Sequence, residues 1–152
     1  MKFSVLIFAL TLTAAVAEEK PATPPPAATP PVETDVSARS RALELAGAFS
    51  NDGYKIRDGY LPGELEPSKP AFLEVNLFAG NEYWFSAAAT SPARKIAVAV
   101  FDEKGQPVDF QVYEDGQAAA AGFVPDVSGR YFVKVTLLEG EKSQFCLLYS
   151  YK

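Results

Sequence analysis

From residue 54 onward the chain is a series of short apolar runs separated by turn residues, and this spacing most constrains its fold. The runs are rich in β-branched and aromatic residues, which is typical of strands. Eight strands are predicted, at 55–61, 71–78, 82–89, 95–102, 108–113, 118–124, 129–138 and 144–151. Gly80-Asn81, Asp115-Gly116 and Ser128-Gly129 fit tight turns between them. The pattern predicts an all-β sandwich.

Two of these runs alternate apolar and polar residues, as strands do when one face of a sheet is buried. In the first, Glu74 and Asn76 separate the apolar residues, and in the second Lys134 and Thr136 do so. The aliphatic residues of the two runs, which we expect in the core, are Leu73, Val75, Leu77, Val133, Val135 and Leu137.

One helix is predicted ahead of the strands, over 37–53. Its apolar residues recur with the period of a single helix face. They are Ala38, Ala42, Leu45, Ala46 and Phe49. Gly53 follows Asn51 and Asp52, which favours an end in the left-handed conformation. Because the apolar stripe is narrow and lacks a basic flank suited to lipid, we expect the helix to cover part of the sheet.

The first 36 residues precede the predicted domain. Residues 1–17 combine Lys2, a short apolar run and small residues at Ala15 and Ala17, which predicts a cleaved signal peptide and export from a bacterial cell. An uncleaved N-terminal anchor is the alternative. Residues 18–36 are rich in Pro, Ala and Thr and form a predicted polyproline-type linker. The β-sandwich domain then occupies 54–152.

Composition excludes several kinds of chemistry. The chain has no histidine and a single cysteine, Cys146, so histidine-based nucleophile systems and thiolate metal clusters are ruled out. Without residues 1–17, 13 basic residues stand against 19 acidic ones, a formal charge of −6. The basic residues are scattered, so nucleic acid is a poor partner. No further run of the chain predicts a membrane span after cleavage of the signal peptide.

Three segments carry a resemblance to a known family. They are Leu-Phe-Ala-Gly-Asn-Glu-Tyr-Trp-Phe at 77–85, the apolar run from Ile96 that ends in Asp-Glu-Lys-Gly at 102–105, and Ser-Gly-Arg-Tyr-Phe-Val at 128–133. Together they resemble the pre-peptidase C-terminal domain of secreted bacterial proteins, over 54–151. The resemblance implies a jelly-roll β-sandwich with a binding or accessory role. The chain departs from the family pattern at Arg94-Lys95-Ile96, where many members carry acidic residues.

Aromatic residues supply the first candidate site. Trp84, with Tyr113, Tyr149 or Tyr151 beside it, would form a platform for stacking on a sugar ring. The alternative is that the helix or a second sheet buries Trp84 as part of a core. Cys146 is predicted to be a small buried residue.

Carboxylates supply two further candidates. Those at the predicted strand ends are candidate Ca²⁺ ligands, although no calcium-loop motif is present, and solvated turns are the alternative. They are Asp102, Glu103, Glu114, Asp115 and Asp126. Glu64 and Glu66 lie on one side of an extended stretch and are a candidate acid and base of a glycosidase, or plain surface residues.

These observations predict an exported, non-catalytic binding or accessory module of the cell envelope, either periplasmic or extracellular. Its expected partner is an envelope polymer or protein, and no cofactor is expected apart from the Ca²⁺ considered above. A carbohydrate-binding or polymer-binding protein that uses aromatics around Trp84 is the first alternative. A hydrolase that relies on carboxylates alone is the second.

Overall fold

The computed structural model describes residues 33–152, so the predicted signal peptide and most of the predicted linker lie outside the described residues. Within that range the elements are α1 (Glu33–Ala48), the 3-10 helix η1 (Phe49–Asp52), β1 (Lys55–Ile56), β2 (Leu61–Leu65), β3 (Ala71–Leu77), β4 (Tyr83–Ala89), β5 (Lys95–Phe101), β6 (Gln111–Asp115), β7 (Ala118–Phe123), β8 (Gly129–Glu139) and β9 (Ser143–Tyr151). No helix in this part of the chain is long and apolar enough to cross a lipid bilayer.

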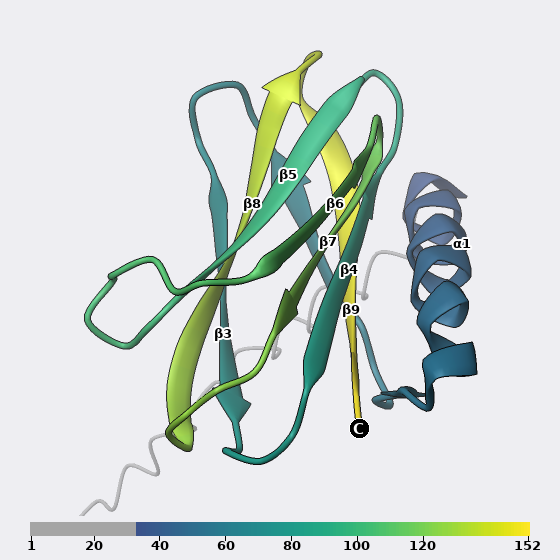
Figure 1. Cartoon of the computed structure of the whole chain (residues 1–152). Helices are drawn as coiled ribbons and strands as arrows, with labels where there is room; N and C mark the ends of the chain where they lie inside the picture. Colours follow the sequence, from purple (N-terminus) through teal and green to yellow (C-terminus); the bar gives the residue numbers. More distant parts are fainter. Residues whose placement is uncertain (1–32) are drawn as a thin grey trace, which may run out of the picture.

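The strands form two antiparallel sheets that face each other, as the sequence predicts (Figure 1). Sheet A holds β6, β7, β4 and β9 in that order, with β1 and β2 both paired to the outer edge of β9. Sheet C holds β3, β8 and β5. The pairs β2/β9, β3/β8 and β4/β7 are nested in the sequence, which is the arrangement of a long hairpin rolled into a jelly roll.

The core lies between the two sheets, because alternate residues of each strand point inward. Val75 and Leu77 of β3 and Val133 of β8 are buried there, opposite Phe85 of β4 and Phe145 of β9. Five of the six aliphatics expected in the core are buried. The sixth, at position 73, is half-buried and packs against the same cluster.

Helix α1 covers the other face of sheet A (Figure 1). Ala38, Ala42 and Ala46 are fully buried on its inner side, and the first two belong to a cluster with Ala88 of β4 and Cys146 of β9. Small side chains on both layers let the helix backbone approach the sheet closely. The predicted helical face and the burial of Cys146 are both seen in the structure.

Three differences from the sequence prediction exceed two residues or divide an element. The helix begins at Glu33 instead of residue 37, and its last predicted turn is the 3-10 helix η1. The first predicted strand is two strands, because Gly59 adopts a φ of 97° and the chain bulges over 57–60. β6 begins at Gln111 instead of residue 108, since the preceding segment pairs with β5 of sheet C before it crosses to sheet A.

Truncation of a buried β8 residue tests the assignment of strand faces. Val133→Ala removes two methyl groups from the space between the sheets and should lower the free energy of unfolding by ~1 to 4 kcal/mol. Val127→Ala is the control, because Val127 is 69% exposed. Urea unfolding followed by circular dichroism measures both. Equal stability of the two variants would contradict the assigned inward face of β8.

A second substitution tests the packing of Trp84 on β7. A Cβ atom added at Gly122 would lie 2.8 Å from the Trp84 ring, whereas one at Gly129 would meet nothing within 4 Å. Gly122→Ala should therefore displace the indole, shift its fluorescence to longer wavelength and destabilise the fold. Gly129→Ala should change neither property. An unchanged Trp84 spectrum in Gly122→Ala would show that the ring does not lie on this glycine.

Candidate ligand-binding pocket

An open pocket of about 680 Å³ lies on one side of the sandwich, at the bulged edge. It lies where the bulge between β1 and β2, the edge strand β3 and the end of β9 meet. The residues that line it are Arg57, Asp58, Gly59, Tyr60, Leu61, Glu74, Val75, Asn76, Phe78, Asn81, Tyr83, Leu147, Leu148, Tyr149 and Tyr151. Its volume lies in the range of about 300 to 1,000 Å³ that is common for small-molecule sites.

Three tyrosines from two neighbouring strands form the aromatic wall of this pocket. Tyr149 and Tyr151 lie two residues apart on β9, so both point to the same face of sheet A, and Tyr151 is paired with Tyr83 of β4. The ring centroid of Tyr83 lies 6.4 Å from that of Tyr149 and 6.5 Å from that of Tyr151. Tyr149 is half-buried and Tyr151 is 38% exposed, so both rings remain partly accessible from the pocket.

Hydrogen bonds fix the orientation of the innermost tyrosine. The Tyr83 hydroxyl accepts hydrogen bonds from the backbone N–H of Phe78, at 3.0 Å, and from the side-chain amide of Asn81, at 3.1 Å. Both donors belong to the turn between β3 and β4. The turn is held in place from a second side, because the Ala79 N–H donates to the Ser128 hydroxyl at 2.8 Å. Hydrogen bonds thus connect Tyr83 of sheet A to the turn between β3 and β4, and the turn to the residue that precedes β8 of sheet C.

Polar side chains surround the aromatic wall. The guanidinium of Arg57 lies 5.0 Å from the centroid of the Tyr149 ring, which is within cation–π range. The backbone N–H of Arg57 also donates a hydrogen bond to the backbone carbonyl of Tyr149, at 3.0 Å, so the bulge is attached to β9. Asp58 comes from the same bulge, while Glu74 and Asn76 come from β3. The pocket combines ring faces with charged and amide groups at its rim.

Trp84 lies on the opposite face of sheet A and does not join this pocket. Its ring stacks on Phe49 of η1, with centroids 4.2 Å apart and planes inclined by 9°, and it packs over Gly122 of β7. Tyr113 of β6 is 42% exposed, and its pairing with Ala120 places it on the face that carries Trp84. The platform of four aromatics expected from the sequence is therefore not assembled. Sheet A separates Trp84 and Tyr113 from Tyr149 and Tyr151.

The sequence analysis missed Tyr83 as the third member of the aromatic wall. It did identify Tyr149 and Tyr151, and their spacing by two residues was a usable sign that they share a face. The contribution of Tyr83 depends on the pairing of β4 with β9, two strands separated by more than fifty residues of chain. No local pattern reports such a pairing.

The carboxylates proposed as calcium ligands do not gather into a metal site in the described part of the chain. Among residues 36–152 no three acidic, histidine or cysteine residues gather closely enough to hold a metal ion. Asp102 instead accepts hydrogen bonds from the backbone N–H groups of Lys104 and Gln106, at 2.9 and 2.8 Å, and so shapes the turn after β5. Glu114 forms an ion pair with Lys95, at 3.4 Å. Burial and the charges of Asp126, Asp102 and Glu103 raise the pKa of Tyr131, so these carboxylates lie near one ring, but neither they nor Asp115 form a group that could hold a metal ion.

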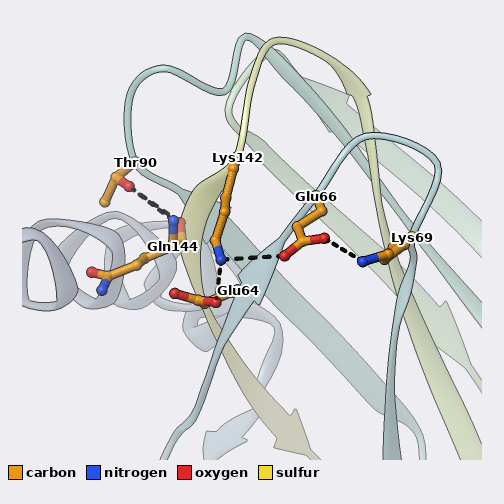
Figure 2. Close-up of polar contacts among 6 residues, drawn as sticks. All are labelled: Glu64, Glu66, Lys69, Thr90, Lys142 and Gln144. Carbon is orange, nitrogen blue, oxygen red and sulfur yellow. Dashed lines mark hydrogen bonds and ion pairs between the residues drawn. The ribbon is translucent and has the colours of Figure 1, made fainter.

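Glu64 and Glu66 are joined by a lysine instead of facing a substrate cleft (Figure 2). The Lys142 ammonium lies 2.9 Å from Glu64 and 3.2 Å from Glu66, and Lys69 lies 2.7 Å from Glu66. Hydrogen bonds from Lys69 and then Lys142 lower the pKa of Glu66. A glycosidase general acid needs a raised pKa so that it stays protonated. The arrangement therefore disfavours Glu66 as that acid.

Removal of Lys142 tests this electrostatic network. The lowered pKa of Glu66 means that its ion pairs stabilise the fold above the ordinary carboxylate pKa, and that this contribution is lost as pH falls through the lowered pKa. Lys142→Met should raise the Glu66 pKa part of the way to its ordinary value, because Lys69 remains. Lys104→Met, which alters a lysine outside the ion pairs of the described residues, should not change it. Titration of the glutamate carboxyl carbons by NMR measures both, and an unchanged midpoint in Lys142→Met would refute the network.

Comparison with known proteins identifies a distant structural similarity. No protein-family model and no curated protein sequence matches the chain. Among solved structures, the chain is similar to the crystal structure of Aeromonas hydrophila PliG, a periplasmic lysozyme inhibitor of g-type lysozyme. The TM-score is 0.49 and the sequence identity is 18%, over 66% of this chain and 90% of that chain. The function of that protein is not carried over to this chain.

Proposed function

We propose that this chain is an exported, non-catalytic binding module of the bacterial cell envelope, and that its pocket holds a saccharide unit of an envelope polymer. The observation that carries the proposal is the joint presence of tyrosine faces and a polar rim in one open pocket. Export rests on the signal peptide predicted for residues 1–17.

The chemistry of a sugar ring matches this pocket. A pyranose has flat faces of C–H groups, which pack on aromatic rings, and an equator of hydroxyl groups, which donate and accept hydrogen bonds. Tyr149 and Tyr151 offer the ring faces. Asp58 and Asn76 offer acceptors, and the amide of Asn76 also offers a donor. An open pocket lets a polymer enter and leave without moving a lid.

Other features support a role in binding without catalysis. Glu64 and Glu66, the carboxylate pair singled out by the sequence, are held in ion pairs by Lys142. The pre-peptidase C-terminal domain that the sequence resembles is likewise an accessory domain of secreted proteins. We propose a distant relationship to that family on the basis of the three sequence segments alone.

Affinity electrophoresis through gels that contain dextran, xylan, galactomannan, alginate or polygalacturonate tests the proposal, with co-sedimentation on peptidoglycan sacculi as a second assay. At least one polymer should retard the mature protein. Tyr151→Ala should weaken that binding roughly two- to tenfold, because it removes an accessible ring from the pocket wall.

Tyr113→Ala is the matched control, since Tyr113 has a similar exposure but lies on the other face of sheet A. Circular dichroism confirms that each variant is folded. Retention by none of the polymers, or equal weakening by both substitutions, would overturn the assignment of the pocket as a saccharide site.

A further inference from the structure

The outer face of sheet C is open to solvent and carries aromatic side chains. Phe72 of β3 is 58% exposed, and Phe101 of β5 and Phe132 of β8 are half-buried on the same face. The rings of Phe72 and Phe101 contact each other edge to face, with centroids 6.2 Å apart. An exposed aromatic patch on a sheet face of a monomeric domain commonly marks an interaction surface.

Two cations lie among these rings. The Lys134 ammonium is 6.0 Å from the ring centroid of Phe72 and 5.7 Å from that of Phe101, and the Arg130 guanidinium is 5.9 Å from that of Phe132. Neither cation forms an ion pair within the described part of the chain. Four lysines elsewhere do: Lys69, Lys95, Lys142 and Lys152.

The charge balance of this face differs from that of the whole chain. Among the outward-facing residues at 72–76 of β3 and 130–136 of β8, the one carboxylate is Glu74, against the two cations Arg130 and Lys134. The chain as a whole has more acidic than basic residues. A small net positive, aromatic surface on an acidic protein is complementary to an acidic ligand.

This face is continuous with the tyrosine pocket. Glu74 and Asn76 line the pocket from β3. They are also paired across the sheet, Glu74 with Phe132 and Asn76 with Arg130. A chain that leaves the pocket over the β3 edge therefore reaches the aromatic rings and cations of sheet C directly.

We infer that the pocket and the outer face of sheet C form one extended binding surface for an acidic polysaccharide. The inference rests on the proposed function and adds a second subsite and a ligand class to it. One saccharide unit occupies the tyrosine pocket, and the following units cross β3. Their ring faces pack on Phe72 and Phe132, and their carboxylates approach Lys134 and Arg130.

The shape of the surface favours a polysaccharide over an acidic peptide. Peptides that add to a sheet edge gain specificity from separate pockets that receive alternate side chains. The outer face of sheet C carries phenylalanine rings beside cations, and two small residues, Ala97 and Ala99, lie on β5. Such a surface suits a repeating chain of rings with regularly spaced charges.

Binding to polygalacturonate, to dextran and to polyglutamate, each measured by calorimetry with the mature protein, tests the inference. Polygalacturonate should bind more tightly than the other two, and its affinity should fall as salt is raised. Lys134→Ala should weaken this binding roughly two- to fivefold, and Phe72→Ala should weaken it by a comparable factor. Glu74→Gln should strengthen it about twofold, because it removes the carboxylate that repels the polymer while keeping hydrogen-bonding capacity.

Lys104→Ala is the control for a general loss of positive charge, since Lys104 lies in the exposed turn after β5 and should leave the affinity unchanged. If Tyr151→Ala weakens binding but Lys134→Ala and Phe72→Ala do not, the extended surface is refuted and the pocket proposal stands. If the sheet C variants weaken binding and Tyr151→Ala does not, the pocket proposal fails. Tighter binding to dextran or polyglutamate than to polygalacturonate would overturn the acidic polysaccharide as the ligand.

Discussion

The central strands β4 and β9 of sheet A are largely apolar on both faces, and the rest of the structure depends on covering the two of them. In β4 and β9 nearly every residue is buried, whichever way it points. Sheet C covers one face and supplies the main core, with Val133 and Val135 opposite Phe85. Helix α1 covers the other face through a separate cluster that includes Ala88 and Cys146. The fold is thus three layers, and the strands β4 and β9 of the middle layer are covered on both faces.

Sheet C and helix α1, which cover the two faces of sheet A, differ in side-chain packing and in hydrogen bonding. Between the sheets, large aromatic and aliphatic side chains interdigitate. Under α1 the contacts are mostly alanines, and the buried hydroxyls of Ser86 and Ser150 find no hydrogen-bond partner among the described residues. A buried hydroxyl without a partner costs about 1 to 3 kcal/mol. Stacking of Phe49 on Trp84 adds an aromatic contact at the end of the helix.

The proposed binding surface lies where the layers are incomplete. The bulge at 57–60 opens the edge of sheet A beside β3 and leaves the tyrosines of β9 accessible, while its Arg57 stays fastened to that strand. Bulges at sheet edges also hinder pairing with other chains, so the same irregularity protects the edge and forms a pocket. Sheet C has no second cover among the described elements, so Phe72 and Lys134 remain at the surface. The proposed binding surface therefore lies on the side of the molecule that α1 does not occupy.

The sequence by itself determined the strand content, the inward face of β3 and β8 and the helical face of α1, because these follow from periods of two or 3.6 residues along the chain. It also identified Trp84 as the residue with two opposed interpretations. Only the tertiary structure decided between them, by placing Phe49 on the indole. Tertiary pairing likewise brought Tyr83 to the pocket and attached Lys142 to Glu64 and Glu66. Such contacts join residues far apart in sequence, so they depend on strand order and register, which local periodicity does not encode.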